Sequence, residues 1–309
     1  GRRDIAVTVS ATGRQGLWIA LQQAGGGFTA APLMDVGSNP RRVKAADLNG
    51  DGSQDLIVLN AGVTLSTAGS LAILRGIGNG TFQTPVQIAV GMNPIAFALG
   101  DLNRDGRLDL AVTAFGANFE DYLGILLGGA GGAFQPVTLL RTGFGPSNAA
   151  IADLDSDGLN DLVVSHCCGD TDMTYLLGKG DGTFKPEVHF FGGGDTTAIL
   201  ATDLNRDQRP DLLIQFGAFG SGGGLAVLMN NTGAATPTPV PAAGFLRVPV
   251  APESIAAVFG TAIAAEARGA ETLPLPQELA GTSVKVVDKT GTERGASLFY
   301  VSPGQVNLL

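Results

Sequence analysis

The sequence predicts an all-β fold built from repeated units, and three observations support this prediction. Short apolar runs rich in β-branched residues, such as LIVLN, LAVTA, LVVSH and LLIQF, are typical of buried strands. Glycine accounts for 46 of the 309 residues and aromatic residues for only 6%, as expected for many short strands joined by tight turns. A nine-residue motif precedes each of the four runs: DLNGDGSQD, DLNRDGRLD, DLDSDGLND and DLNRDQRPD.

The motif recurs at intervals of 54, 52 and 50 residues, which is the length of a four-stranded β-propeller blade. Its four copies begin at Asp47, Asp101, Asp153 and Asp203. A glycine-rich turn that ends in phenylalanine always lies 19 residues earlier, at Phe28, Phe82, Phe134 and Phe184. Constant spacing is expected of two strands packed in a sheet, because a slip of one residue would turn core side chains outward.

The two markers define the order of strands within a blade. Strand one ends at the motif and strand two follows it; a loop of variable length then leads to strand three, found in LAILRG, GILLGG and TYLLGK. The glycine-rich turn leads to strand four, and a run such as PIAFALG begins the next blade. Antiparallel order places the motifs on one face, and the variable loops and blade-to-blade crossings on the opposite face.

The chemistry of the motif points to calcium. Asp or Asn occupies positions one, three and five, Asp occupies position nine, and glycine occupies position six in the first three copies. Calcium takes six to eight oxygen ligands, and carboxylates crowded at this spacing repel one another unless a cation lies among them. An EF-hand is excluded because position twelve is Val or Ile instead of Glu, and the motif leads into a strand.

The predicted metal-ligating positions are one, three, five, seven and nine of each motif. They are Asp47, Asn49, Asp51, Ser53, Asp55; Asp101, Asn103, Asp105, Arg107, Asp109; Asp153, Asp155, Asp157, Leu159, Asp161; and Asp203, Asn205, Asp207, Arg209, Asp211. Gln208 replaces the glycine of the fourth copy, and a left-handed backbone there would cost a residue with a Cβ about 1 kcal/mol or more. We therefore expect three Ca²⁺ sites and a weaker fourth.

The chain divides into three parts. Residues 1–4, GRRD, align with GRLD at 106–109, so Asp4 is expected at position nine of a further loop whose first half is missing. Blades are expected over residues 1–232, a Pro/Ala/Thr linker over 233–244 and a small, truncated β-sandwich over 245–309. Both ends of the sequence look cut.

Composition excludes some partners. Thirteen of the 28 acidic residues lie at the metal-ligating positions, and the formal net charge is −9. Without a compensating basic cluster, nucleic acid is not an expected partner. No apolar stretch of about 18 residues is present, so no membrane span is expected in this segment.

With both markers in register, residues 1–232 resemble the FG-GAP/VCBS repeats of calcium-binding β-propellers, which include integrin α chains and many secreted bacterial proteins. The resemblance implies about five blades of a seven-bladed propeller and an extracellular, secreted or cell-surface bacterial protein. The phrases APESIAAVFGT, LAGTSVKV and LFYVSPGQVN resemble an uncharacterised, Ig-like C-terminal domain of secreted acidobacterial proteins.

We expect a binding or adhesion module whose variable loops contact a glycan or an extracellular protein. Asn118, Tyr122, His166 and Asp170 are the candidate ligand-contacting residues. The alternative is a polysaccharide-active enzyme, a lyase or hydrolase, since some such enzymes use related propellers. No catalytic residue is predicted, because no Ser/His/Asp order, phosphate-binding glycine loop or isolated acid pair is present.

The two cysteines, Cys167 and Cys168, are adjacent. Three interpretations stay open for them: a soft-metal site with neighbouring His166, a vicinal disulfide, and unreactive thiols at the edge of a blade. Adjacent cysteines do not match the usual C-x2-C spacing of zinc sites.

Overall fold

The computed structural model describes residues 2–64, 67–115, 121–167, 173–190, 196–216 and 224–230, and short segments between 256 and 308. Within these ranges the chain forms β-strands and one 3-10 helix, η2 (Ala130–Gly132), so the all-β prediction is confirmed. No helix in the described ranges is long and apolar enough to cross a membrane.

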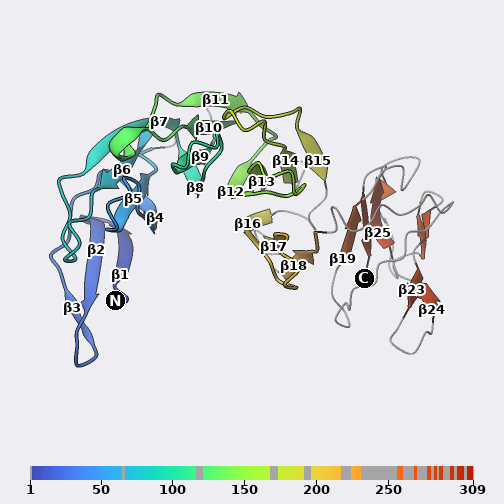
Figure 1. Ribbon diagram of the computed structural model, residues 1–309, viewed down its shortest axis with the longest axis horizontal. Coiled ribbons are helices and arrows are strands. Elements are labelled where there is room, and N and C mark those ends of the chain that lie inside the picture. Colours follow the sequence, from blue (N-terminus) through green and yellow to red (C-terminus); the bar gives the residue numbers. More distant parts are fainter. Residues whose placement is uncertain are drawn as a thin grey trace.

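Five antiparallel sheets follow one another along the chain and form an open arc (Figure 1). The first sheet comprises β1 (Ile5–Ala11), β2 (Arg14–Gln22) and β3 (Phe28–Ala30); the second comprises β4 (Pro40–Ala46), β5 (Asp55–Asn60), β6 (Ala68–Leu74) and β7 (Val86–Met92). The third comprises β8 (Pro94–Gly100), β9 (Asp109–Ala114), β10 (Tyr122–Leu126) and β11 (Thr138–Arg141). The fourth comprises β12 (Pro146–Ala152), β13 (Asp161–His166), β14 (Met173–Leu176) and β15 (Val188–Phe190), and the fifth β16 (Thr196–Thr202), β17 (Asp211–Phe216) and β18 (Gly224–Leu228).

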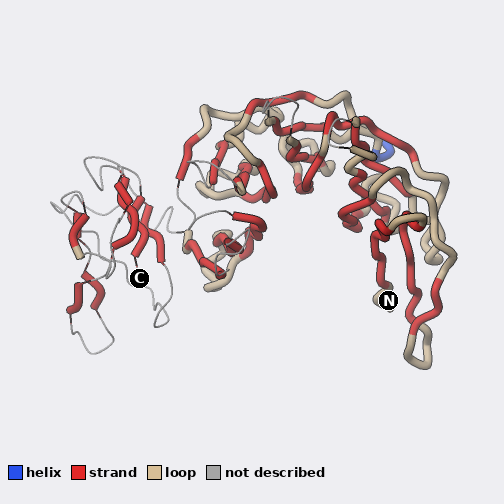
Figure 2. The backbone as a smooth tube through the Cα atoms, turned by 180° about the vertical axis from the view of Figure 1, so that it is seen from behind, coloured by secondary structure: helices blue, strands red, loops and turns tan. Residues whose placement is uncertain are grey.

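Strand order within each sheet follows the chain, as the spacing of the two markers predicted. The second, third and fourth sheets have four strands, and the first and fifth have three described strands. The first strand of each sheet lies on the concave side of the arc and the last on the convex side in the sheets with four strands (Figures 1 and 2).

Hydrophobic cores lie between successive sheets, because alternate side chains of a strand point to opposite faces. Ile57 and Leu59 of β5 pack toward the third sheet, whereas Leu56 and Val58 of the same strand pack toward the first. The second strands β5, β9 and β13 are consequently buried along their full length. Phe82 of the glycine-rich turn packs against the core shared by the first two sheets. Phe134 and Phe184 pack against the next two cores in the same way, whereas Phe28 is half exposed. In three of the four copies, the constant spacing of the turn thus reflects packing between sheets.

The C-terminal segments form separate small sheets. β19 (Ala256–Phe259), β26 (Gln305–Leu308), β25 (Leu298–Ser302) and β20 (Arg268–Gly269) pair in that order. Two hairpins pair β21 (Glu278–Leu279) with β22 (Thr282–Ser283) and β23 (Lys285–Val287) with β24 (Glu293–Gly295). The predicted sandwich is not tested by these strands, and the predicted linker at 233–244 lies outside the described residues.

Candidate metal centres

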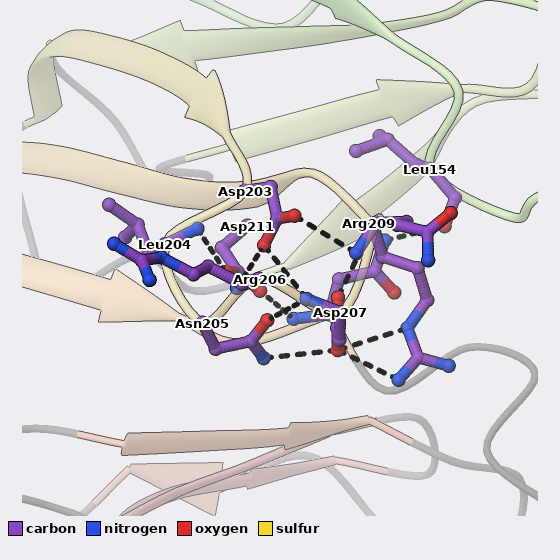
Figure 3. Close-up of polar contacts among 10 residues, drawn as sticks. Leu154, Asp203, Leu204, Asn205, Arg206, Asp207, Arg209 and Asp211 are labelled. Atoms are coloured by element: carbon purple, nitrogen blue, oxygen red, sulfur yellow. Dashed lines mark hydrogen bonds and ion pairs between the residues drawn. The ribbon is translucent and has the colours of Figure 1, made fainter.

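The four motifs form the connections between the first and second strands of sheets two to five. We call them loop one (47–55), loop two (101–109), loop three (153–161) and loop four (203–211). In each loop the aspartate at position one accepts backbone N–H groups of later residues through both carboxylate oxygens. In loop one, Asp47 Oδ1 accepts Gly50 N at 2.8 Å and Asp47 Oδ2 accepts Gly52 N at 2.8 Å. In loop four, Asp203 accepts Arg206 N at 2.6 Å and Gln208 N at 2.9 Å (Figure 3).

Position nine holds the loop to the rest of its sheet. Asp161 is fully buried and accepts Leu154 N at 2.8 Å and Gly178 N at 2.8 Å, so it joins the loop to the end of strand three. The equivalent residues Asp55, Asp109 and Asp211 are also fully buried and accept the same pair of backbone groups. This role was not predicted from the motif.

The interpretation of Asp4 as position nine of a further loop agrees with its contacts. Asp4 Oδ1 accepts Gln22 N at 2.8 Å, at the end of β2. Gly76 N donates to Asp55 Oδ1 at the same distance of 2.8 Å at the end of β6.

The residues at positions four and six of every loop have a left-handed backbone. At position six, Gly52, Gly106 and Gly158 have φ between 78° and 83°, and Gln208 has φ of 69°. The condition that made loop four the weaker site in the sequence analysis is therefore met, since Gln208 bears a Cβ in a conformation that favours glycine.

The carboxylate at position five has different partners in different loops. In all four loops its Oδ1 accepts the backbone N–H of position seven, as in Asp157 with Leu159 N at 2.8 Å. In loops one, two and four the Asn at position three also donates its amide to position five, at 2.8, 3.3 and 3.0 Å. Loop three has Asp155 at position three and therefore lacks this donor.

Arginine side chains neutralise one carboxylate in each of loops one, two and four. Arg107 Nη1 lies 2.9 Å from Asp105 Oδ2, and Arg209 Nη2 lies 2.8 Å from Asp207 Oδ2 (Figure 3). In loop one the cation comes from strand three: Arg75 Nη1 lies 2.6 Å from the buried Asp55 Oδ2. Among the described residues, no ion pair to a carboxylate of loop three is seen.

Loop three consequently keeps its carboxylates without an ion pair among the described residues, and only the more distant attraction of Lys185 acts on Asp155. One ligand atom of each of Asp153, Asp155 and Asp161 can be chosen so that all three lie within 4.8 Å of one another. Burial raises the pKa of Asp155, and the neighbouring Asp157 and Asp153 carboxylates raise it further. By contrast, hydrogen bonds from Arg209 lower the pKa of Asp207 in loop four.

The donor chemistry of these loops fits a hard divalent cation. The convergent groups are carboxylate and amide oxygens, the ligands that calcium takes, and loop three offers them with neither an amide donor nor a guanidinium competing for them. The predicted calcium positions themselves stay predictions.

The candidate ligand-contacting residues differ in placement. The Tyr122 hydroxyl of β10 lies 3.1 Å from Met92 O of the neighbouring sheet, and burial raises the pKa of its phenol. His166 is fully buried, so its ring meets a ligand only if covering residues move. Asn118 and Asp170 lie outside the described residues.

His166 begins a chain of hydrogen bonds that leads to the surface. Its Nδ1 lies 3.1 Å from the Phe144 carbonyl and therefore carries the proton, and its Nε2 lies 3.0 Å from Thr174 Oγ1. Thr174 Oγ1 also lies 3.0 Å from His189 Nδ1. Burial lowers the pKa of His166 to about 4, so the ring is neutral at pH 7.

Cys167 is disulfide-bonded. The only other cysteine of the sequence is Cys168, which lies outside the described residues. Among the interpretations left open above, unreactive free thiols and a thiolate metal site do not agree with a disulfide at Cys167.

Sequence reasoning missed Arg75, although a signal was present. Leu127 and Leu177 stand at the end of strand three in the following units, and Arg75 breaks this pattern. The Arg75 guanidinium also donates to the Gly132 carbonyl in the glycine-rich turn of the third sheet. One arginine thus links loop one to the next sheet.

Comparison with known proteins places the sequence among repeat proteins. The FG-GAP-like repeat family matches residues 1–58, 61–112 and 153–214, more than half of the chain. A search of curated proteins found no match. Among solved structures, the biofilm matrix protein Bap1 of V. cholerae is similar over 64% of this chain and 40% of that protein, with 18% identity and a TM-score of 0.32.

Proposed function

Because the chain belongs to the FG-GAP-like repeat family, we propose that it is a calcium-stabilised, extracellular binding or adhesion module. In this proposal the five sheets are blades of a seven-bladed β-propeller, and residues 245–309 form an Ig-like sandwich after a linker at 233–244. The observation that carries the metal proposal is the convergence of Asp153, Asp155 and Asp161 oxygens within 4.8 Å in a repeated motif.

Calcium acts in this proposal as a counter-ion that holds the loops, and loop three depends on it most. The ion relieves the repulsion among three partly or fully buried carboxylates, which no arginine seen in the described residues relieves there. Loops one, two and four bind more weakly, because the ion has to compete with a guanidinium for one ligand.

The proposed binding surface lies on the face opposite the calcium loops. The second strands β5, β9, β13 and β17 end on this face, and loops carry binding residues more often than the scaffold does. Calcium then supports ligand binding indirectly, by fixing the sheets that carry the variable loops.

The metal proposal is tested by melting the protein in calcium and in EGTA at equal ionic strength. For free calcium about 100 times the dissociation constant, each occupied site adds about 2.7 kcal/mol to the free energy of unfolding. Asp157→Asn in loop three should lose part of the calcium-dependent rise in melting temperature. Asp181→Asn is its matched control, because Asp181 is an exposed acid in the glycine-rich turn of the fourth sheet. Equal melting temperatures in calcium and EGTA would contradict the proposal.

The binding proposal is tested with a glycan array and a panel of extracellular proteins, run beside eliminase and hydrolase assays. Saturable binding without turnover is the expected result. Turnover of a polysaccharide would instead favour the enzyme alternative.

A further inference from the structure

The concave side of the arc carries one concentration of charge. The first strands of sheets two to five, β4, β8, β12 and β16, are described along their whole length, and their only charged side chains are Arg41, Arg42 and Lys44 of β4. All three are basic in a chain with a formal net charge of −9. We call these three residues the basic strand.

The positive charges of the basic strand repel one another. Burial lowers the pKa of Arg42, and the charge of Arg41 lowers it further. Burial and the charge of Arg42 lower the pKa of Lys44. Among the described residues none of the three makes an ion pair. By accessible surface Arg42 is partly buried and Lys44 is exposed, so desolvation concerns Arg42 above all. Neighbouring cations gain free energy when an anion joins them.

Two of the three bases have contacts that account for their place in the fold. Arg42 Nε donates to Ile95 O at 2.9 Å, and Lys44 Nζ lies 5.3 Å from the centre of the Phe97 ring, so both side chains reach toward β8. The Arg41 side chain is exposed and makes no such contact with described residues. Contacts with the third sheet therefore account in part for basic side chains at positions 42 and 44. No contact with described residues accounts for the basic side chain of Arg41.

Polar groups of the first sheet lie beside the basic strand. Thr8 Oγ1 donates to the Arg41 carbonyl at 3.3 Å, and Ser10 Oγ lies 2.7 Å from Asn39 Oδ1. Ser10 and Arg41 are exposed, and Thr8 and Asn39 are partly buried. Hydroxyl and amide groups suit sugar hydroxyls, whereas a guanidinium pairs with a carboxylate through two parallel hydrogen bonds. Arg41 and Arg42 also lie at the end of β4 that is farther from loop one.

We infer that the basic strand binds an acidic polysaccharide, with uronate carboxylates on Arg41, Arg42 and Lys44 and sugar hydroxyls on Ser10 and Asn39. This inference rests on the proposed binding function and names the chemical class of its ligand. Nucleic acid fits less well, because its affinity depends on many phosphate contacts and the basic strand offers three cations.

The test measures binding of fluorescent oligogalacturonate to the whole protein in calcium, with maltooligosaccharide and a single-stranded DNA oligomer as comparison probes. Wild type is expected to bind oligogalacturonate, more weakly as sodium chloride rises, since exposed charges are screened. Arg41→Gln with Lys44→Gln should reduce the affinity about tenfold or more, because each variant removes a charge-assisted hydrogen bond. This double variant keeps the Arg42 contact to Ile95.

The matched control is Lys179→Gln with Lys185→Gln, which removes two exposed charges from the glycine-rich turn of the fourth sheet. The control should bind like wild type. Equal loss in both double variants, no loss in the basic-strand variant, or equally tight binding of DNA would overturn the inference. Binding lost in Asp157→Asn and kept in the basic-strand variant would show a calcium-bridged glycan, which also overturns it.

The proposed function can survive failure of this inference. If wild type binds maltooligosaccharide or a protein and not oligogalacturonate, the inference fails and the binding function stands. If wild type binds no probe or panel member, both fail, while calcium-dependent melting still reports separately on the metal sites.

Discussion

Loops three and four share one backbone path and differ in how their charge is balanced. In both, position one accepts backbone N–H groups and a buried aspartate at position nine joins the loop to its sheet. Loop four adds Asn205 and Arg209 as donors to Asp207, whereas loop three brings three carboxylates within 4.8 Å. The same turn therefore pairs one carboxylate with a guanidinium in loop four, whereas in loop three the three neighbouring carboxylates are the groups that the proposed calcium ion would balance.

The backbone path of a loop and its proposed calcium affinity depend on different residues. The loop path follows from backbone hydrogen bonds to position one and from left-handed residues at positions four and six, which all four loops possess. In the proposal, calcium affinity depends on the side chains that pair with the carboxylates: those at positions three and seven, and Arg75 in loop one. A family motif therefore predicts the turn more securely than it predicts the strength of each metal site.

The largest expected effect concerns position nine, which the two loops share. Asp161→Ala leaves Leu154 N and Gly178 N without their acceptor, and each unpaired buried N–H costs about 1–3 kcal/mol. Asp211→Ala should lose a similar amount. Urea unfolding in EGTA measures the loss of stability in each variant. A loss that is seen with calcium and absent in EGTA would show that the aspartate acts only through the metal.

A pH effect is expected in the fourth sheet, which carries loop three. His166 has a pKa of about 4 in the fold, below its ordinary value of 6.5, so the unfolded chain takes up a proton first as the pH falls. Stability should decrease by about 3 kcal/mol between about pH 6.5 and pH 4 and change no further from this group below pH 4.

The measurement is denaturant unfolding in EGTA at several pH values. His166→Gln should flatten this part of the profile relative to wild type, whereas His189→Gln should leave most of it in place, because burial is the main cause of the lowered His166 pKa and His189 a lesser one. An unchanged profile in His166→Gln would contradict the assignment. The fifth sheet has Phe216 at the equivalent end of its second strand and should lack the effect.

The third prediction addresses the difference between the loops directly. Asp157→Asn should weaken calcium binding about tenfold, which removes about 1.4 kcal/mol of calcium-dependent stability at saturating calcium. Asp207→Asn should remove less, because Arg209 already occupies that carboxylate. Calorimetric titration with calcium measures the affinity of both variants. Equal losses of affinity would show that the Arg209 guanidinium does not compete with the ion.

The smallest effect concerns position six. Gln208→Gly should stabilise loop four by about 1 kcal/mol or less, because the Cβ no longer opposes a φ of 69°. The reciprocal change, Gly158→Gln, should cost loop three a similar amount, since no neighbouring atom lies within 4 Å of a Cβ built there. Thermal melting of both variants checks the pair, and a loss in Gln208→Gly would contradict the backbone argument.

The sequence by itself determined the class of fold, the order of strands and the path of the loops. These features are local or periodic: a continuous apolar run places a strand between two cores, and fixed spacing keeps its register. The position of Asp4 also followed from alignment alone, and its contact with Gln22 agrees with it.

Only the tertiary structure decided which charges meet and which residues are covered. Arg75 lies 20 residues from Asp55 in the sequence, and the chain brings the two together because β5 and β6 pair side by side. His166 looked like part of an exposed loop, yet Thr174, Thr196 and Phe144 enclose it from three other segments. Spacing along the chain fixes a strand, whereas the balance of buried charge depends on neighbours that only the packing of sheets brings together.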